Sequence, residues 1–267
     1  MNGLALFAGG GGLELGLSLA LGTDYRTIAY VEREATSAAV LAANMERGWL
    51  DKAPIWDDVT TFTGDAVSPL VDQIDIISAG FPCQPWSVAG SRKGTEDERW
   101  LWPLIFRLVR EIRPRSIFLE NVPGLLHGGI EHVLGDLASV GFDAEWTSVR
   151  ASDVGAPHRR ERVFILGYTD SKRRRTQGNG QFTPAGIGWG SRPLQWPPSP
   201  QSTESWGKVI EVRPDLAPAT QPEVRGVVNG LARGLARSDK LRILGNGVVP
   251  QQAALAYTLL SGRISNP

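Results

Sequence analysis

The sequence contains one cysteine, and its setting favours a nucleophile. Cys83 lies in the segment GFPCQPWS, between Pro82 and Pro85. Cysteine is most often a small buried hydrophobic residue, but here two prolines stiffen the backbone directly after an apolar run, so we expect the thiol to face a cleft. A free thiol is only weakly ionised at neutral pH and needs positive charge or substrate beside it to become a nucleophile. Arg160 and Arg162 are the candidates to supply that charge.

A carboxyl group with the right chemistry follows about forty residues later. Glu120 ends the apolar run SIFLE in the segment LENVPGLL, and Asn121 follows it. A carboxyl group near a nucleophile can donate a proton if its environment raises its pKa. We expect Asn121 to help fix the loop that presents Glu120. The alternatives are a solvated carboxylate at a strand end and, for the segment HRRER at 158–162, a solvated basic strand end.

The N-terminal segment FAGGGG indicates a ligand-binding turn. Glycines allow the backbone to approach a ligand closely, and Glu32, about twenty residues further on, can accept hydrogen bonds from ribose hydroxyls. Together they predict a site for a cofactor that contains a nucleoside. The glycines alone are equally compatible with helix–strand packing. No Lys-Ser or Lys-Thr follows them, which disfavours the phosphate-binding loop of a nucleotide hydrolase.

Alternating apolar strands and helices are predicted to position these residues. Residues 4–7, 27–31, 74–81 and 116–120 have the short apolar runs of buried strands, and residues 13–22, 35–45 and 100–112 have helical spacing. Two further strands are expected around a Gly-Pro turn within 146–169. This order predicts an α/β fold with a doubly wound, mostly parallel, Rossmann-like sheet. Its carboxyl edge would gather the strand ends, which are Gly9, Glu32, Cys83 and Glu120.

The composition divides the chain into three parts. Residues 1–168 are predicted to form the catalytic and cofactor-binding domain. Residues 169–240 are rich in Gly, Pro, Ser and Gln, lack periodicity and are predicted to form a small inserted region. Residues 241–267 turn apolar again, with a helix expected at 250–261, and return to the first domain. For three tryptophans of the insertion, packing in a small core is favoured over stacking on bases: Trp189, Trp196 and Trp206.

Charge and cysteine content exclude several classes of protein. The chain has 267 residues, 42% of them hydrophobic, and 28 basic residues balance 28 acidic ones, so a nucleic-acid surface must come from local clusters such as 172–175. One cysteine and three histidines offer neither a disulfide framework nor zinc-ligand spacing, which fits a reducing cytoplasm and no metal. No apolar segment has membrane-spanning length, so we expect a soluble protein.

The segments FAGGGG, GFPCQPWSVAG, ENVPGLL, APHRRERVF and GNGVVPQ, in this order, resemble the cytosine-5 DNA methyltransferase family, in particular its small phage- or prophage-like bacterial members. The resemblance covers residues 3–168 and about 241–262. It implies that Cys83 adds to C6 of a cytosine flipped out of the duplex while Glu120 protonates N3. C5 then accepts the methyl group of S-adenosylmethionine, and loss of the C5 proton expels the cysteine.

The same resemblance assigns the remaining site residues. Arg160 and Arg162 join the catalytic set, and Arg162 would hold the base together with Glu120. Glu32 would contact the ribose, Asp58 the adenine amino group and Trp102 the adenine ring, while Asn246 and Val248 would close over the methionine end. The full cofactor set is Phe7, Gly9, Gly11, Gly12, Glu32, Asp58, Pro82, Trp102, Asn246 and Val248. Segment 84–102 would close on DNA, and the DNA-contacting set is Gln84, Ser87, Arg99, Asn121 and Arg225.

Two features depart from the family pattern. His158 stands where the family has glutamine in the arginine motif, and the region at 169–240 is short for target recognition. Residues 222–247 are expected to take the place of the family motif that normally ends this region, with Arg225 and Asn229 as DNA contacts. We therefore expect a recognition site of few base pairs. The expected partner is double-stranded DNA, and the protein is expected to be a cytoplasmic monomer, bacterial or phage-encoded.

Three alternatives stay open at this point. A tRNA cytosine-5 methyltransferase would share PCQP and ENV, but it also carries a Cys-Phe-Thr signature, and this chain has no second cysteine. A non-catalytic DNA-binding or regulatory protein that retains the fold is disfavoured by the intact Cys83, Glu120, Arg160 and Arg162. A nicotinamide-dependent oxidoreductase would rest on the glycine turn and Glu32 alone and would leave the PCQP loop unexplained.

Overall fold

The computed structural model describes residues 1–65, 68–81, 100–169, 188–189, 192–193, 243 and 245–265. Six of the predicted site residues lie outside the described residues: Pro82, Cys83, Gln84, Ser87, Arg99 and Arg225. Most of the predicted insertion at 169–240 also lies outside them, as do the side chains of its three tryptophans. The predicted boundaries at 168/169 and 240/241 therefore stay predictions.

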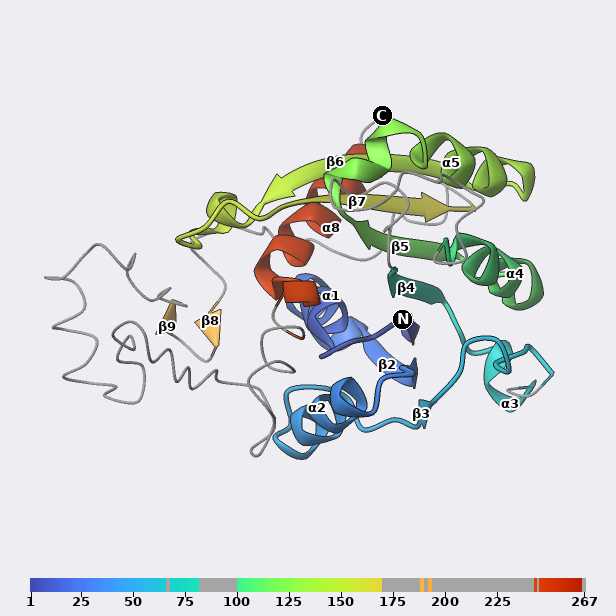
Figure 1. Ribbon diagram of the computed structural model, residues 1–267, viewed down its shortest axis with the longest axis horizontal. Helices are drawn as coiled ribbons and strands as arrows, with labels where there is room; N and C mark the ends of the chain where they lie inside the picture. Colours follow the sequence, from blue (N-terminus) through green and yellow to red (C-terminus); the bar gives the residue numbers. More distant parts are fainter. Residues whose placement is uncertain are drawn as a thin grey trace, which may run out of the picture.

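The core of the described chain is a seven-stranded sheet with helices on both faces (Figure 1). Its strands are β1 (Asn2–Leu6), β2 (Arg26–Val31), β3 (Ile55–Trp56), β4 (Ile76–Gly80), β5 (Ser116–Asn121), β6 (Asp143–Arg150) and β7 (Glu161–Tyr168). The helices are α1 (Gly12–Leu21), α2 (Ala35–Glu46), α3 (Ser68–Val71), α4 (Trp102–Ile112), α5 (Ile130–Ser139) and α8 (Pro250–Ser265). Short 3-10 turns lie at Gly22–Asp24, Pro123–His127 and Ala151–Val154, and β8 (Gly188–Trp189) pairs with β9 (Arg192–Pro193).

The strand order places a ligand crevice at the centre of the sheet. The order is β3-β2-β1-β4-β5-β7-β6, with β1 to β5 parallel and β7 antiparallel to both of its neighbours. The chain winds outward from β1 to β3 and then outward in the other direction from β4 to β5. In such sheets the crevice opens at the carboxyl ends of the two strands where the winding reverses. Here those strands are β1 and β4, which end next to the glycine turn and next to Phe81.

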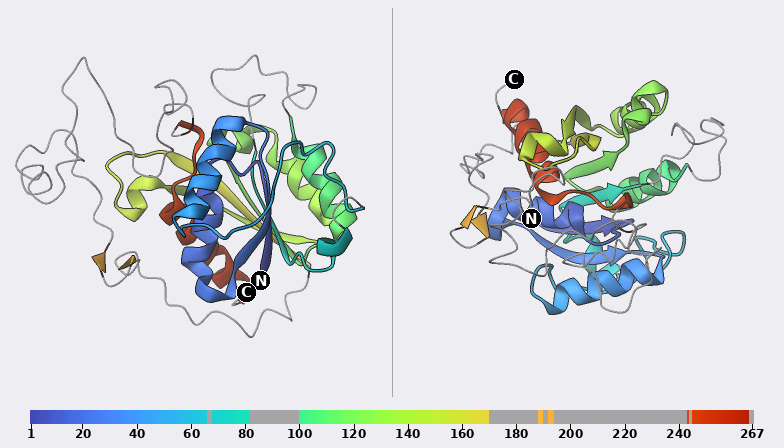
Figure 2. Two further views of the ribbon diagram at one scale, coloured as in Figure 1. Left: turned by 90° about the horizontal axis from the view of Figure 1, so that it is seen from below. Right: turned by 60° about the vertical axis from the view of Figure 1, so that its left-hand side comes forward.

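The two faces of the sheet are buried by different helices, as the two views in Figure 2 show. Successive residues of a strand point to opposite faces. Thus Ile76 and Phe118 pack with α1 and α8, whereas Ile77 and Leu119 pack with α4 and α5. A smaller cluster joins β1 and β2 to α2. Because both faces are covered, the central strands are apolar at nearly every position, which explains their unbroken hydrophobic runs.

The predicted fold class is confirmed, with small differences at the ends of elements. The strands expected at 27–31, 74–81 and 116–120 and the helices expected at 13–22, 35–45 and 100–112 are all present within a few residues. Elements that were not predicted include α3, β3 and α5. Strand β3 has only two residues, too few to show a period, and helix α5 carries Gly135 and only two fully buried apolar residues, Val133 and Leu137.

Candidate active site

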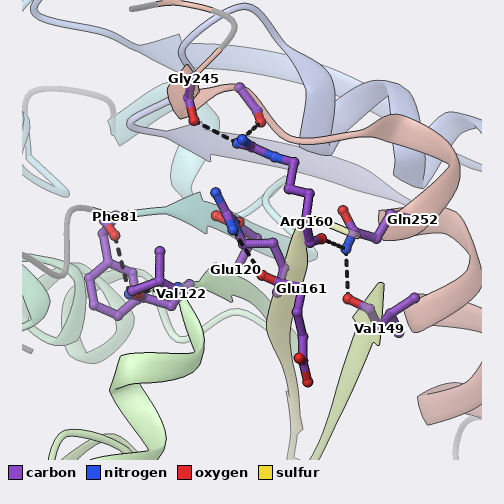
Figure 3. Close-up of polar contacts among 11 residues, drawn as sticks. Phe81, Glu120, Val122, Val149, Arg160, Glu161, Gly245 and Gln252 are labelled. Carbon is purple, nitrogen blue, oxygen red and sulfur yellow. Dashed lines mark hydrogen bonds and ion pairs between the residues drawn. The ribbon is translucent and has the colours of Figure 1, made fainter. Parts of the chain in front are cut away.

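The carboxyl edge of the sheet brings Glu120, which is labelled in Figure 3, next to Arg162. Glu120 lies near the end of β5, and Arg162 near the start of the neighbouring antiparallel strand β7. Arg162 Nε lies 2.8 Å from Glu120 Oε1, and the two side chains are 15% and 8% exposed. Arg162 Nη1 also donates to the carbonyl of Glu161 at 2.8 Å. The planar guanidinium is therefore held by the acid and by its own strand.

Burial and charge act on Glu120 in opposite directions. Removal of the carboxyl group from water raises its pKa, and the positive charges of Arg162 and Arg160 lower it. The pKa stays above its usual value because burial is the larger effect. A carboxyl group with a raised pKa retains its proton closer to neutrality, as a proton donor requires. Strand β4 ends beside it: a Cβ on Gly80 would lie 3.3 Å from Glu120 Oε2.

Asn121 has a different role from the DNA contact that the sequence predicted. Its side chain is 3% exposed, Nδ2 donates to the carbonyl of Phe81 at 3.1 Å, and Oδ1 accepts from the amide of Val122 at 2.8 Å. Both polar atoms of the amide are thus engaged within the protein. Asn121 thus holds Phe81 against β5, the strand that carries Glu120. The structure supports the expectation that Asn121 helps to fix this region, and not the expectation of a DNA contact.

Arg160 does not share the position of Arg162. Its Nη2 donates to the carbonyls of Gly245 and Gly247, at 2.8 and 2.5 Å, and so binds the turn that precedes α8 (Figure 3). Of the residues predicted in this turn, Asn246 is exposed and Val248 is partly buried. Val248 contacts two parts of the edge. A Cβ built on Gly12 would lie 2.5 Å from the carbonyl oxygen of Val248, and one built on Gly80 would lie 3.8 Å from its Cγ2.

The glycine turn leaves space at the end of β1. Gly9 has a φ of 57° and Gly11 a φ of 81°, which glycine adopts without strain, and even Phe7 has a positive φ of 53°. A Cβ at Gly9 would meet no atom of the described chain within 4 Å, whereas at Gly11 it would lie 2.3 Å from Leu50 Cδ1. Gly9 therefore borders open space, and Gly11 and Gly12 allow close packing.

Two carboxylates lie at the adjacent strand ends. Glu32 Oε2 accepts from the amide of Gly9 and Oε1 from the amide of Glu34, both at 2.7 Å, so the side chain ties the end of β2 to the glycine turn. The amide of Glu32 donates to the carbonyl of Trp56, which joins the ends of β2 and β3. Asp58 is partly exposed, and hydrogen bonds from the amide and the hydroxyl of Thr60, together with the charge of Arg33, lower its pKa.

Trp102 lies in the core instead of on a cofactor face. Its side chain is 1% exposed, its ring stacks on Phe106, and its Nε1 donates to Asp136 Oδ2 on α5 at 2.7 Å. The buried ring offers no face to an adenine, so the predicted adenine contact of Trp102 is wrong. Helix α4 begins at Trp102, so the hydrogen bond to Asp136 joins its first turn to α5. Helix α5 was not predicted from the sequence.

Two buried polar residues were not predicted from the sequence. Gln252 on α8 is 0% exposed and donates to the carbonyls of Val149 and Arg160. Glu14 in the first turn of α1 is 1% exposed and accepts from Ser78 Oγ at 2.7 Å. The available signal was a polar residue on the apolar face of a helix, because Gln252 lies one turn before Ala256 and Glu14 one turn before Leu17.

The described residues hold neither a metal site nor a membrane span. No three His, Cys, Asp or Glu side chains gather there as metal ligands. No helix there combines the length and the apolar character needed to cross a membrane.

Comparisons with known proteins agree with this geometry. The model of the C-5 cytosine-specific DNA methylase family matches residues 1–191. The Type II methyltransferase M.NgoMIV of Neisseria gonorrhoeae is 35% identical over 167 residues, which are 61% of this chain and 50% of that protein. The Type II methyltransferase M.CviJI of Paramecium bursaria Chlorella virus IL3A is 36% identical over 165 residues, 61% of this chain and 42% of that protein.

A solved structure shares the fold. It is described as a DNA modification methyltransferase encoded within a prophage of E. coli, is 31% identical, and has a TM-score of 0.53 over 65% of this chain and 48% of that one. The doubly wound sheet is thus the shared framework. This chain belongs to the C-5 cytosine-specific DNA methylase family. It spans about half the length of the curated relatives named above.

Proposed function

We propose that the protein is a DNA cytosine-5 methyltransferase that uses S-adenosylmethionine. The observation that carries the proposal is the buried pair of Glu120 and Arg162, joined at 2.8 Å at the sheet edge next to Phe81. Two positions after Phe81 the sequence has Cys83, the only cysteine of the chain. A thiol, an acid and an arginine, in this order along the sequence of a family member, supply the groups that C5 methylation needs.

The glycine turn fits the proposed cofactor. Gly9 borders open space within the described chain, and each oxygen of Glu32 accepts one backbone hydrogen bond, which leaves each with further capacity to accept a ribose hydroxyl. Asp58 is a partly exposed acceptor on the loop that follows β3. We propose Phe7, Gly9, Gly11, Gly12, Glu32, Asp58, Asn246 and Val248 as the cofactor set, with Pro82 beside them. When bound, S-adenosylmethionine supplies an electrophilic methyl group.

The chain's own groups activate the base. C5 of cytosine is a weak nucleophile, and addition of the Cys83 thiolate to C6 makes it a stronger one. Glu120 donates its proton to N3 in this step, and its raised pKa makes the protonated form available. Arg162 orients the carboxyl group and can bind the polar edge of the base. After C5 has gained the methyl group, the C5 proton passes to solvent, N3 returns its proton to Glu120, and the bond between sulfur and C6 breaks, which restores the thiolate.

Double-stranded DNA is the proposed substrate, and residues 169–240 are the proposed recognition region. A cytosine inside a duplex does not expose C6, so the base must leave the stack, at a cost of about a few kcal/mol that contacts in the pocket and to phosphates offset. Gln84, Ser87, Arg99 and Arg225 are proposed DNA contacts. The short insertion predicts a site of few base pairs, and a methylome with a long, strictly read site would contradict this.

The test is transfer of tritiated methyl from S-adenosylmethionine to unmethylated DNA and to bulk tRNA. We expect label in DNA as 5-methylcytosine. Label in tRNA alone would assign the protein to the RNA-modifying branch, and no label in either from a folded protein would favour a non-catalytic DNA-binding protein.

Two matched variants separate the roles within the site. Cys83→Ala removes the thiol and should abolish both label transfer and the covalent complex with DNA that contains 5-fluorocytosine. Glu120→Gln keeps the shape of the side chain but has no acidic proton, so single-turnover transfer should fall at least about a hundredfold, in line with loss of one acid catalyst. A Glu120→Gln enzyme with the wild-type rate would remove Glu120 from the mechanism.

A further inference from the structure

Two sets of hydrogen bonds join the start of β7 to the C-terminal segment in both directions. Arg160 Nη2 donates to the carbonyls of Gly245 and Gly247, at 2.8 and 2.5 Å. In return, Gln252 Nε2 donates to the carbonyl of Arg160 at 2.8 Å and to the carbonyl of Val149 at 2.6 Å. We call these five residues the clasp. Figure 3 shows Arg160 between the Gly245 turn and Gln252.

Gln252 is a polar side chain buried on an apolar helix face. It is 0% exposed on a helix face whose other buried members include Ala253, Ala256 and Leu260. A buried amide is unfavourable unless it is hydrogen-bonded. The donor of this amide serves two main-chain carbonyls, while Oε1 has no partner among the described residues. The side chain is thus committed to its two acceptors, which lie at the end of β6 and just before β7.

The backbone held by Gln252 is strained. Arg160 has a φ of 27°, a conformation that non-glycine residues rarely adopt and that persists where surrounding contacts determine it. Its carbonyl also accepts from the amide of Ala151 at 3.3 Å. The Nε atom of Arg160 is buried and finds no partner in the described chain. Removal of the Gln252 donor would release the shorter of the two described hydrogen bonds to this carbonyl.

Arg160 is connected to Glu120 through Arg162. Arg162 lies two positions further along β7, pairs in register with Val149, and carries the ion pair to Glu120. Among the described residues, the charged groups that act on Glu120 are Arg162 and Arg160. On its other sides Glu120 meets Gly80, and Val248 lies next to Gly80 in turn. A change at Arg160 therefore moves both positive charges relative to the carboxyl group.

We propose that Gln252 is a positioning residue, whose hydrogen bonds to Val149 and Arg160 hold the arginine strand so that Arg162 and Glu120 keep their working geometry. The same C-terminal segment places Val248 against Gly12 of the glycine turn. Docking of α8 thus sets the proton donor and the proposed cofactor turn together. The proposal rests on the proposed function for its catalytic consequence, but its structural core concerns the Glu120 pair alone.

The experiment compares Gln252→Met, which keeps the volume and removes the donor, with Gln251→Met as the matched control on the same helix. Titration of Glu120 is followed by NMR with 13C-labelled glutamate, and its signal is assigned by its loss in Glu120→Gln. In Gln252→Met the titration midpoint should move upward, because the arginines then stabilise the carboxylate less. Single-turnover methyl transfer at saturating S-adenosylmethionine should fall at least about tenfold, with cofactor affinity changed less than about twofold. The control should match the wild type in all three.

The outcomes separate this proposal from the proposed function. Wild-type protein that transfers no methyl group to DNA or tRNA would defeat the proposed function, while the NMR comparison would still decide the clasp. If Gln252→Met titrates and reacts like Gln251→Met, Gln252 is not a positioning residue. Should Gln252→Met fail to fold, Gln252→Asn, which retains an amide but is one methylene shorter, should give the same changes at smaller size, and wild-type behaviour there would overturn the proposal.

Discussion

Glu14 makes the stability of the fold depend on pH. Its carboxyl group lies in the first turn of α1, 1% exposed, with Oε1 accepting from Ser78 Oγ and Oε2 without a hydrogen-bond partner in the described residues. Burial is the larger effect and raises the pKa of Glu14 from 4.5 to about 7, although the Ser78 hydrogen bond opposes it. The folded protein therefore holds this proton over a pH range in which the unfolded chain has lost it.

The sign and size of the effect follow from proton linkage. Between pH 4.5 and about 7 the folded state binds more protons than the unfolded state, so the free energy of unfolding falls as pH rises. At about 1.4 kcal/mol for each pH unit over roughly 2.5 units, the loss is about 3 kcal/mol at pH 8, and no more is lost above that. Glu14→Gln removes the titration. We expect it to match the wild type within about 1 kcal/mol near pH 4 and to exceed it by about 2–4 kcal/mol at pH 8.

Urea unfolding of both proteins at pH values from 4.5 to 8.5 measures this difference. Glu131→Gln is the control, because Glu131 is also a glutamate in the first turn of a helix but is exposed. Its stability relative to the wild type should change little over the same range. If the difference between Glu14→Gln and wild type is the same at pH 5 and pH 8, the carboxyl group is not held in its neutral form by burial and the reasoning is wrong.

Three further predictions concern the edge of the sheet. Gly12→Ala places a Cβ 2.5 Å from the carbonyl oxygen of Val248 and should lower the free energy of unfolding by about 1–3 kcal/mol, whereas Gly135→Ala, in the open middle of α5, should raise it by up to about 1 kcal/mol. A stable Gly12→Ala protein would show that the C-terminal turn does not pack there. Asn121→Ala leaves the carbonyl of Phe81 and the amide of Val122 without their partner and should cost about 1–3 kcal/mol in urea unfolding, with unchanged stability as the contrary result. Glu32→Gln offers one acceptor where two amides now donate, so calorimetry should show at least about tenfold weaker binding of S-adenosylmethionine, and unchanged affinity in a folded variant would remove Glu32 from the cofactor set.

The sheet and the main members of its edge could be predicted from the sequence because their signals are local. A run such as Ile76 to Phe81 is apolar at nearly every position since helices cover both faces, and a parallel sheet gathers its strand ends at one edge whatever the details of packing. The approach of Glu120 to Arg162 follows from their places on neighbouring strands. Only the register of β5 with β7 decided that Arg162, and not Arg160, carries the ion pair.

Other roles depended on partners that no local pattern names. The family resemblance predicts Trp102 and Asn121 as ligand contacts, but their polar atoms bond to Asp136 and Phe81, residues that lie 34 and 40 positions away. Helix amphipathicity predicts which residues are buried but not which neighbours they meet, so it cannot separate a core tryptophan from one that faces a ligand.

By itself, the sequence determined the alternation of strands and helices, the class of sheet and the residue types at its edge, since these depend on hydrophobic period and turn chemistry within short windows. The tertiary structure alone decided which arginine pairs with Glu120, that Asn121 and Trp102 point inward, and that Gln252 and Glu14 are buried polar residues. The physical reason is that burial and hydrogen bonding are set by contacts between segments as distant as Val149 and Gln252, and such contacts exist only once the chain has folded.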